Sequence, residues 1–303
     1  MSGYKNFGWF IIILLSVILP LNGFVSLKII PCAREQSMGG VGASSAIGPQ
    51  GMYFNPSITA GLQTFAVAMN YQKRFLDTYA QSIFIIRPLK SFNVGLGISI
   101  FNAGKVEVRP PYPTTEALGE INPIDFTAYL NISREIKADN KSFRFGISPR
   151  IYYSKIAEYD ASGYGLDLGI FFAPTPNFSW GVSILDFGSE IKYYRTSDNL
   201  PTRLVGGFEY FLGWLSVKSF PNVKISTDLN YFIYERQANL NIGSEFDINR
   251  KFFMRAGYRL GSGSETYTLG LGVIAGKFRI DYAFIPYSLN LGVGHHLSLG
   301  MGY

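Results

Sequence analysis

Charged side chains that alternate with apolar ones are the residues of this sequence with the greatest capacity for chemistry. In 278–284 (FRIDYAF), Arg279 and Asp281 stand between aromatic and aliphatic residues, and Asp167 stands between leucines in 164–172. Side chains two apart on a strand share one face, so these charges are expected to gather on one side of a sheet. The whole set carries both signs in nearly equal number: Asp125, Arg144, Arg150, Asp167, Arg203, Glu209, Asp228, Glu245, Arg255, Arg259, Arg279 and Asp281.

Such a mixed set predicts ion pairs rather than catalysis or ion selectivity. Buried charges need partners, whereas an ion-selective pore shows rings of one sign. The sequence contains no GxSxG, HExxH or P-loop motif, and its one cysteine and two adjacent histidines, His295 and His296, leave no zinc site. A hydrolase would need a nucleophilic serine, such as Ser288, beside these histidines. We expect no enzyme, no metal and no cofactor.

A period of two extends over most of the chain after Thr64, and a helical period does not fit it. Where the first strand runs outward, the long connections 105–123, 188–201 and 286–294 fall outside, as in outer-membrane barrels. Only 213–222 is a long connection on the inner side. About fourteen strands are predicted, at 64–73, 77–88, 92–104, 124–136, 143–158, 163–174, 178–187, 202–212, 223–234, 236–248, 252–260, 265–274, 277–285 and 295–303.

The composition favours a membrane β-barrel. The chain has 303 residues, of which 16% are charged and 16% aromatic, with 33 glycines and a mean hydropathy of +0.13. Soluble domains carry about 25% charged residues, and barrel strands show lipid only every second residue. A secreted β-sandwich would alternate in the same way, but the number of strands and the glycine and aromatic content favour the barrel. The net charge of +6 is spread without a basic block, so nucleic acid is not an expected partner.

The N-terminal residues predict export. Lys5 precedes an apolar run over 9–20, which is shorter than the roughly 20 residues of a membrane span. Residues 1–23 therefore resemble a cleaved signal peptide, with a membrane anchor helix as the alternative. The expected location is the bacterial outer membrane.

Residues 24–63 are expected to form a plug inside the barrel that 64–303 form. This stretch is rich in glycine and lacks alternation, so it does not suit a lipid-facing strand. Arg34 and Glu35 would join the lumenal ion pairs. Its turns and extended backbone are expected at residues that favour them, namely Gly39, Gly40, Gly42, Asn55 and Pro56.

The last strand ends in Tyr303, which by alternation shares a face with Leu299 and Met301. A terminal aromatic residue on an alternating strand is what the barrel-assembly machinery recognises. We therefore predict that these three residues form an assembly signal.

Four segments resemble the FadL-like and PorV/PorQ outer-membrane families. Residues 33–57 (AREQSMGGVGASSAIGPQGMYFNPS) are similar to their A-R-x-x-x-M-G-G/E-x-G opening and aromatic-x-N-P-A motif, with Ser57 in place of alanine. LPTRLVGGFEY (200–210), FMRAGYRLGSG (253–263) and KFRIDYAFIPYSLNLGVGHHLSLGMGY (277–303) resemble PorV-type strands and the closing hairpin. The segments occur in the family's order, and its fourteen strands agree with the periodicity.

The resemblance implies an outer-membrane barrel with one of two activities, neither enzymatic. PorV-type members serve type IX secretion as partners of the translocon and carriers of exported proteins, whereas FadL-type members admit hydrophobic small molecules. The outer connections are shorter than those of transporting members. We therefore predict a secretion-associated role through docking of protein partners, with a passive channel for hydrophobic compounds as the alternative and a purely structural barrel as a third class. Membrane lipid and the assembly machinery are expected partners in each case.

Overall fold

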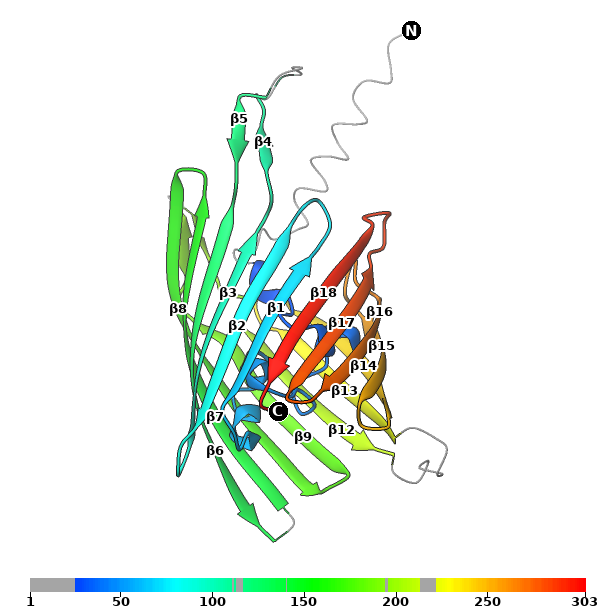
Figure 1. The fold of residues 1–303 in the computed structure, drawn as a ribbon. Helices are drawn as coiled ribbons and strands as arrows, with labels where there is room; N and C mark the ends of the chain where they lie inside the picture. Colours follow the sequence, from blue (N-terminus) through cyan, green and yellow to red (C-terminus); the bar gives the residue numbers. More distant parts are fainter. Residues whose placement is uncertain (1–24, 111, 113–116, 140, 194–195, 213–221) are drawn as a thin grey trace.

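The wall of the molecule is a closed antiparallel barrel (Figure 1). The computed structural model describes residues 25–110, 112, 117–139, 141–193, 196–212 and 222–303. Within these residues, fourteen strands pair with their neighbours along the chain, and β1 closes on β18. This confirms the predicted fold. The wall strands are β1 (Ala66–Lys73), β2 (Tyr79–Pro88), β3 (Asn93–Asn102), β6 (Ile124–Ala138), β7 (Lys141–Ile156), β8 (Tyr159–Thr175), β9 (Phe178–Gly188), β12 (Arg203–Phe211), β13 (Asn222–Phe232), β14 (Gln237–Ile248), β15 (Phe252–Leu260), β16 (Tyr267–Ala275), β17 (Phe278–Pro286) and β18 (Val293–Met301).

The two ends of the barrel differ in the length of their connections. At the inner edge, β2 and β3, β8 and β9, and β16 and β17 are joined by turns of a few residues, and at the outer edge the longest described connections are 189–202 and the ribbon after β3. This distribution is typical of outer-membrane barrels, whose longer loops face outward. The connection before β13 lies mostly outside the described residues. The predicted signal peptide, residues 1–23, lies wholly outside the described residues.

Two short ribbons were not foreseen from the sequence. β4 (Val106–Val108) pairs with β5 (Gly119–Ile121), and β10 (Ile191–Tyr193) pairs with β11 (Thr196–Asp198). The β4–β5 ribbon projects beyond the outer end of the barrel (Figure 1). Strands of three residues are too short to display a period of two, which is why the alternation did not reveal them.

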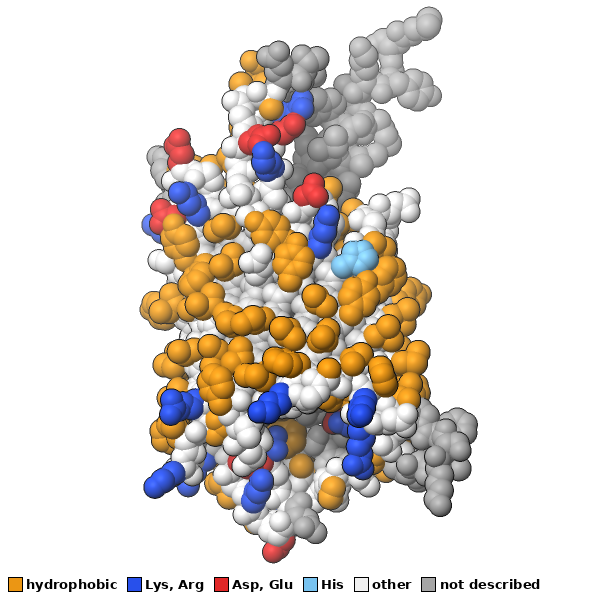
Figure 2. All heavy atoms as spheres, viewed as in Figure 1, with side chains coloured by type: hydrophobic (Ala, Val, Ile, Leu, Met, Phe, Trp, Pro, Cys, Tyr) orange, Lys and Arg blue, Asp and Glu red, His pale blue; other side chains and the backbone are white. Residues whose placement is uncertain are grey.

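The outward face of the wall is a belt of exposed apolar side chains (Figure 2). Leu96 on β3, Leu229 on β13 and Leu271 on β16 are each more than half exposed. Soluble monomers rarely expose contiguous apolar patches of more than a few hundred Å², whereas a membrane barrel presents such a band to lipid. The belt therefore marks the part of the wall that spans the membrane.

Register along the wall is regular at β3 and irregular at β8–β9. β3 pairs without a break on both sides, and a Cβ at Gly97 would overlap the ring of Phe84, so this glycine allows close packing rather than a kink. The β8–β9 ladder shifts register between Leu166 and Leu168, where Asp186 has a φ of 57°. This bulge turns Asp186 inward from a position that an unbroken strand would direct to lipid.

Short helical turns lie inside the barrel (Figure 1). They belong to residues 25–63, which we call the N-terminal segment, and are η1 (Val25–Lys28), α2 (Ala33–Ser37), η2 (Pro49–Tyr53) and η3 (Ile58–Gly61). Nearly all residues from 30 to 60 are buried. In the described part of the chain, no helix is long and apolar enough to cross a membrane.

Candidate functional site in the barrel interior

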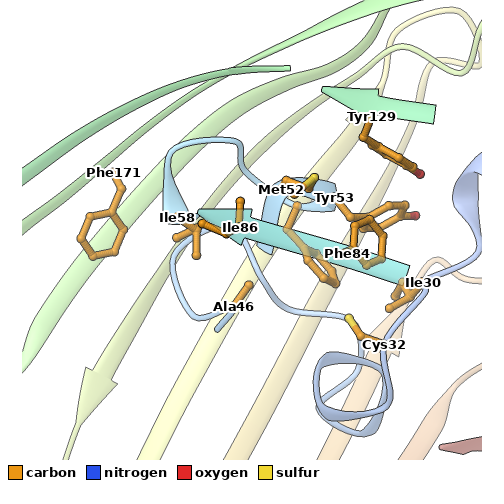
Figure 3. Packing of buried hydrophobic residues seen from close by; sticks show 11 residues of the cluster. Ile30, Cys32, Ala46, Met52, Tyr53, Ile58, Phe84, Ile86, Tyr129 and Phe171 are labelled. Atoms are coloured by element: carbon orange, nitrogen blue, oxygen red, sulfur yellow. The ribbon is translucent and has the colours of Figure 1, made fainter. Parts of the chain in front are cut away.

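The N-terminal segment packs its apolar side chains on the inner wall (Figure 3). Met52, Tyr53 and Ile58 form one buried cluster with Phe84 and Ile86 of β2. Wall glycines allow the two backbones to approach, because a Cβ at Gly146 would overlap the backbone of Pro56 and one at Gly257 would overlap that of Gly39. The glycines of the segment fit the same spaces. Gly39 and Gly40 have φ values of 72° and 81°, and a Cβ at Gly42 would overlap the ring of Phe54.

A first ion cluster joins α2 to the strands near the C-terminus. Arg34 Nε lies 3.0 Å from Glu245 Oε2, which also lies 2.7 Å from Arg255 Nε. Arg255 continues to Asp281 at 2.9 Å, and Asp281 pairs with Arg279 at 2.8 Å. All five side chains are at least nine-tenths buried.

Within this cluster, Arg34 is held as a cation from two sides. Its Nη1 lies 2.9 Å from Glu35 Oε1 and also donates to the Ser45 carbonyl at 2.8 Å. Burial would lower the pKa of the Arg34 guanidinium, but Glu245 and Glu35 raise it well above its ordinary value. Arg34 thus pairs with two carboxylates inside the barrel, and its ion pair with Glu245 joins the segment to the wall.

A second ion cluster lies at the β8–β9 bulge. Arg150 contacts Asp167 and lies 2.7 Å from Asp186 Oδ1, which also accepts a hydrogen bond from the Tyr152 hydroxyl at 2.9 Å. The Arg203 guanidinium lies over the Tyr53 ring, 5.1 Å from its centroid. Sequence reasoning missed Asp186, although a carboxylate in a lipid-facing register was itself a signal that the strand bends there.

A third cluster lies at the outer edge, in the 261–266 connection. Glu265 lies 2.6 Å from Arg259 and 2.7 Å from Arg74, and it accepts a hydrogen bond from Gln36 of α2 at 3.0 Å. Burial alone would raise the pKa of Glu265, but Arg259 and Arg74 lower it to about 2. Neither Glu265 nor Arg74 was singled out from the sequence. Arg74 lies in a connection, and Glu265 is the first residue of the predicted strand 265–274 but precedes the observed β16, so alternation gave no reliable direction for either.

Hydrogen bonds fix the rest of the segment. Asp228 Oδ2 accepts from the backbone N–H of Gly42 at 2.6 Å and of Ala43 at 2.9 Å. Asn55 Nδ2 donates to the carbonyls of Ala43 at 2.8 Å and Ile170 at 2.9 Å, so it ties two parts of the segment to β8. The carbonyl of the next residue, Pro56, accepts a hydrogen bond from Asn131 Nδ2 at 3.1 Å.

Arg144 and Glu209, both chosen from the sequence, lie apart from these clusters, near the inner opening. Arg144 pairs with Glu135 at 2.8 Å, and Glu209 lies 3.7 Å from Lys224. Their side chains are partly exposed. In the described residues, no group of His, Cys, Asp and Glu side chains is placed to hold a metal ion.

Cavities lie on both sides of the N-terminal segment. The outer cavity, of about 340 Å³, is bounded by the segment at Lys28 and Ile30 and by Arg203, Asn230 and Arg259 of the wall. The inner cavity, of about 450 Å³, is bounded by 44–47 and by Arg144. A smaller space of about 30 Å³ lies between the segment and β2, β3 and β6. The outer and the inner cavity thus lie against different parts of the segment.

The C-terminus differs from the prediction based on alternation. Leu299 is directed outward, 43% exposed, and Met301 shares its face. Tyr303 does not, because Gly302 has a φ of 89° and reverses the chain. The Tyr303 hydroxyl accepts a hydrogen bond from Gln50 Nε2 at 3.3 Å, and its ring lies against Gly48 and Gly300, at the inner opening. Its assignment to the apolar outward face was therefore wrong, while its role in assembly stays a prediction.

Solved structures of similar shape include a hydrocarbon channel and a FadL homologue. A mutant described as a monoaromatic hydrocarbon channel, TodX, superposes with a TM-score of 0.62 and 12% identity over 94% of this chain and 100% of that one. A FadL homologue from Pseudomonas aeruginosa superposes with a TM-score of 0.55 and 11% identity over 89% and 97%. No family model matches the sequence, and no curated protein matches it.

At these identities the likeness concerns the fold. The chain has the fold of FadL-type outer-membrane channels, and these neighbours are not enzymes. A specific kinship with PorV or PorQ does not emerge from them.

Proposed function

We propose that the protein is a passive outer-membrane channel for small hydrophobic molecules, in which the N-terminal segment blocks the path and must shift to open it. The observation that carries this proposal is the arrangement of an outer and an inner cavity with the segment between them. The fold shared with TodX, a monoaromatic hydrocarbon channel, supports it by analogy. This is the function that the sequence resemblance offered as its alternative.

The contacts of the segment hold it against the wall in this arrangement. It is joined to the wall by ion pairs, hydrogen bonds and the apolar cluster around Met52 and Phe84. A hydrophobic solute that reaches the outer cavity meets Ile30, Phe54 and Val205 among walls that are otherwise mostly polar and charged. Transfer of an apolar solute from water to such side chains is favourable. Net passage of the solute through the channel would follow its concentration gradient.

Uptake by cells tests the proposal, because a lipopolysaccharide leaflet slows hydrophobic solutes that phospholipid vesicles admit freely. Cells that produce the protein should take up radiolabelled toluene or oleate faster than cells that lack it. Deletion of residues 33–50 should make the barrel conduct ions in planar bilayers and disturb this uptake. Equal uptake with and without the protein, at equal outer-membrane levels, would contradict the channel function. Steady conductance of the wild type that the deletion leaves unchanged would contradict the blocking role of the segment.

A second candidate function is docking of a secretion translocon or of exported proteins. The β4–β5 ribbon favours it, since Val106, Val108 and Leu118 are exposed above the barrel, and exposed apolar groups mark contact sites. Replacement of 105–122 by a short turn should then abolish secretion and the capture of translocon components in detergent, while uptake of toluene is unchanged. Loss of uptake with normal secretion would instead assign the ribbon to the channel.

We also propose that residues 1–23 direct export and are removed, and that Leu299, Met301 and Tyr303 direct assembly. Deletion of Tyr303 should leave the chain in the periplasm. Because Tyr303 also contacts Gln50, the variant Gln50→Ala separates the two effects: it removes that contact and should leave outer-membrane levels normal. Mass spectrometry of the mature N-terminus checks the cleavage.

A further inference from the structure

The two edges of the barrel differ in exposed charge. Among the described residues, the outer edge exposes cations and acids in equal number: Lys73, Lys105, Arg109, Lys155, Lys192 and Arg236 against Asp77, Glu107, Glu120, Glu158, Asp160 and Glu190. The inner edge exposes one acid, Asp139, and a set of cations that we call the basic girdle: Arg87, Lys90, Arg134, Lys137, Lys141, Arg250, Lys251 and Lys277. The exposed charge of the inner edge is therefore mostly positive, whereas that of the outer edge is balanced.

The girdle is not neutralised by the protein itself. Lys137 pairs with Glu135 at 3.1 Å. The other seven cations form no ion pair with a described residue. At the outer edge, by contrast, Lys105 lies 2.9 Å from Glu120 and Arg109 lies 2.6 Å from Glu107. Unpaired exposed cations of one sign attract an anionic partner from outside the chain.

The girdle is continuous with the lipid-facing belt. Arg134 stands between Ile132 and Ile136 on the outward face of β6, and both isoleucines are more than two-fifths exposed. Lys277 lies in the turn directly before the exposed Phe278 of β17. Figure 2 shows basic side chains along the lower margin of the apolar belt. Long basic side chains lay their stems along apolar surface and hold their charge at the water boundary, which places these charges at the depth of lipid headgroups.

We propose that the basic girdle binds the headgroups of anionic phospholipids in the inner leaflet. The cations lie at four separate connections, either in the turn or on a flanking strand end, between β2 and β3, β6 and β7, β14 and β15, and β16 and β17. A shell of lipid meets such a distribution from several sides, whereas one acidic globular protein would contact a single side. Attraction between basic residues and anionic headgroups acts within a Debye length, and the girdle lies at that range. This inference does not depend on what the barrel transports.

Lipid retention by the full-length protein tests the proposal. The purified barrel is equilibrated in mixed micelles of phosphatidylglycerol and phosphatidylcholine, and the retained lipids are counted by native mass spectrometry. The test variant carries Arg87→Gln, Lys90→Gln, Lys251→Gln and Lys277→Gln. The matched control carries Lys73→Gln, Lys155→Gln, Lys192→Gln and Arg236→Gln, which removes the same charge from the outer edge.

The wild type and the control should retain about threefold or more phosphatidylglycerol over phosphatidylcholine, and the test variant should retain both equally. Enrichment of phosphatidylglycerol by the wild type should also fall as the salt concentration rises. This measurement needs only the wild type, so it tests the proposal even if the test variant does not fold. Equal enrichment in all three proteins, or none in the wild type, would overturn the proposal. So would girdle-dependent capture of an acidic periplasmic protein without phosphatidylglycerol enrichment, since that result would assign the surface to a protein partner.

Discussion

The outward and inward faces of the barrel wall meet different surroundings, and β17 shows both at adjacent residues. Ile280 is directed outward and is 43% exposed, whereas Arg279 and Asp281 are directed inward and are almost fully buried. The outward side chain needs only to be apolar, because lipid is its partner. Each inward side chain needs a particular partner at a particular distance. Outward positions therefore depend little on one another beyond local pairs such as Tyr282 and His295, whereas inward positions form networks.

Removal of one network member should give the largest effect. Glu245→Ala would leave Arg34 and Arg255 buried without their shared carboxylate. Loss of one partner of a buried pair costs about 3–5 kcal/mol. The free energy of unfolding should fall by that amount, as measured by guanidinium unfolding in lipid vesicles with tryptophan fluorescence as the signal. Glu190→Ala, at an exposed outer-edge position, is the matched control. Equal shifts for the two variants would show that the inward network is not stabilising.

A charge on the outward face should give the next largest effect. Ile280→Arg places a cation in the apolar belt, which costs about 2–4 kcal/mol near the bilayer midplane and about 0–1 kcal/mol near the interfaces. Phe278→Arg lies on the same face, two residues closer to the inner edge, and should cost less. The same unfolding measurement compares them. A larger loss for Phe278→Arg would mean that the belt is placed wrongly relative to the membrane.

Sequence reasoning predicted the outward face well, since alternation depends only on the contrast between lipid and lumen. The strand number and the inward direction of Arg279 and Asp281 followed from it. Alternation did not predict which inward residues meet. Ala283 shares the inward face with Asp281, yet it has no lumenal water to reach, because it packs on Ala33 of α2. That contact depends on how a segment without periodicity folds inside the barrel.

The failures at Asp186 and Tyr303 share one physical cause, namely a local backbone conformation that breaks the period of two. Asp186 and Gly302 both have positive φ values, and the first turns its own side chain inward while the second redirects Tyr303. A single such residue reverses the face to which the next residues of the strand are directed. A glycine such as Gly302 allows a positive φ and hence a change in chain direction, but its presence in the sequence does not show that the change occurs.

An uncharged tie between the segment and the wall should matter less than an ionic one. Asn55→Ala removes the donor to the Ala43 and Ile170 carbonyls and the acceptor for Ser57. Buried groups left without partners cost about 1–3 kcal/mol. Gln63→Ala changes an exposed amide of the same segment and should be neutral. If both variants unfold at the same denaturant concentration as the wild type, Asn55 does not anchor the segment.

The smallest effect should be a pH dependence at the outer edge, where the inward network reaches a connection. Arg259 and Arg74 lower the pKa of Glu265 to about 2 in the folded protein, below its value of roughly 4.3 in an unfolded chain. The stabilisation from Glu265 is therefore complete above the unfolded value and is lost as pH falls from there toward 2. Between about pH 6 and pH 4 this loss amounts to roughly 0.6 kcal/mol. Unfolding of the wild type and of Glu265→Gln at both pH values measures it: the wild type should lose that much more stability than the variant. Parallel losses would mean that the ion pairs of Glu265 with Arg259 and Arg74 do not stabilise the fold, and the network would then end at the membrane-spanning strands.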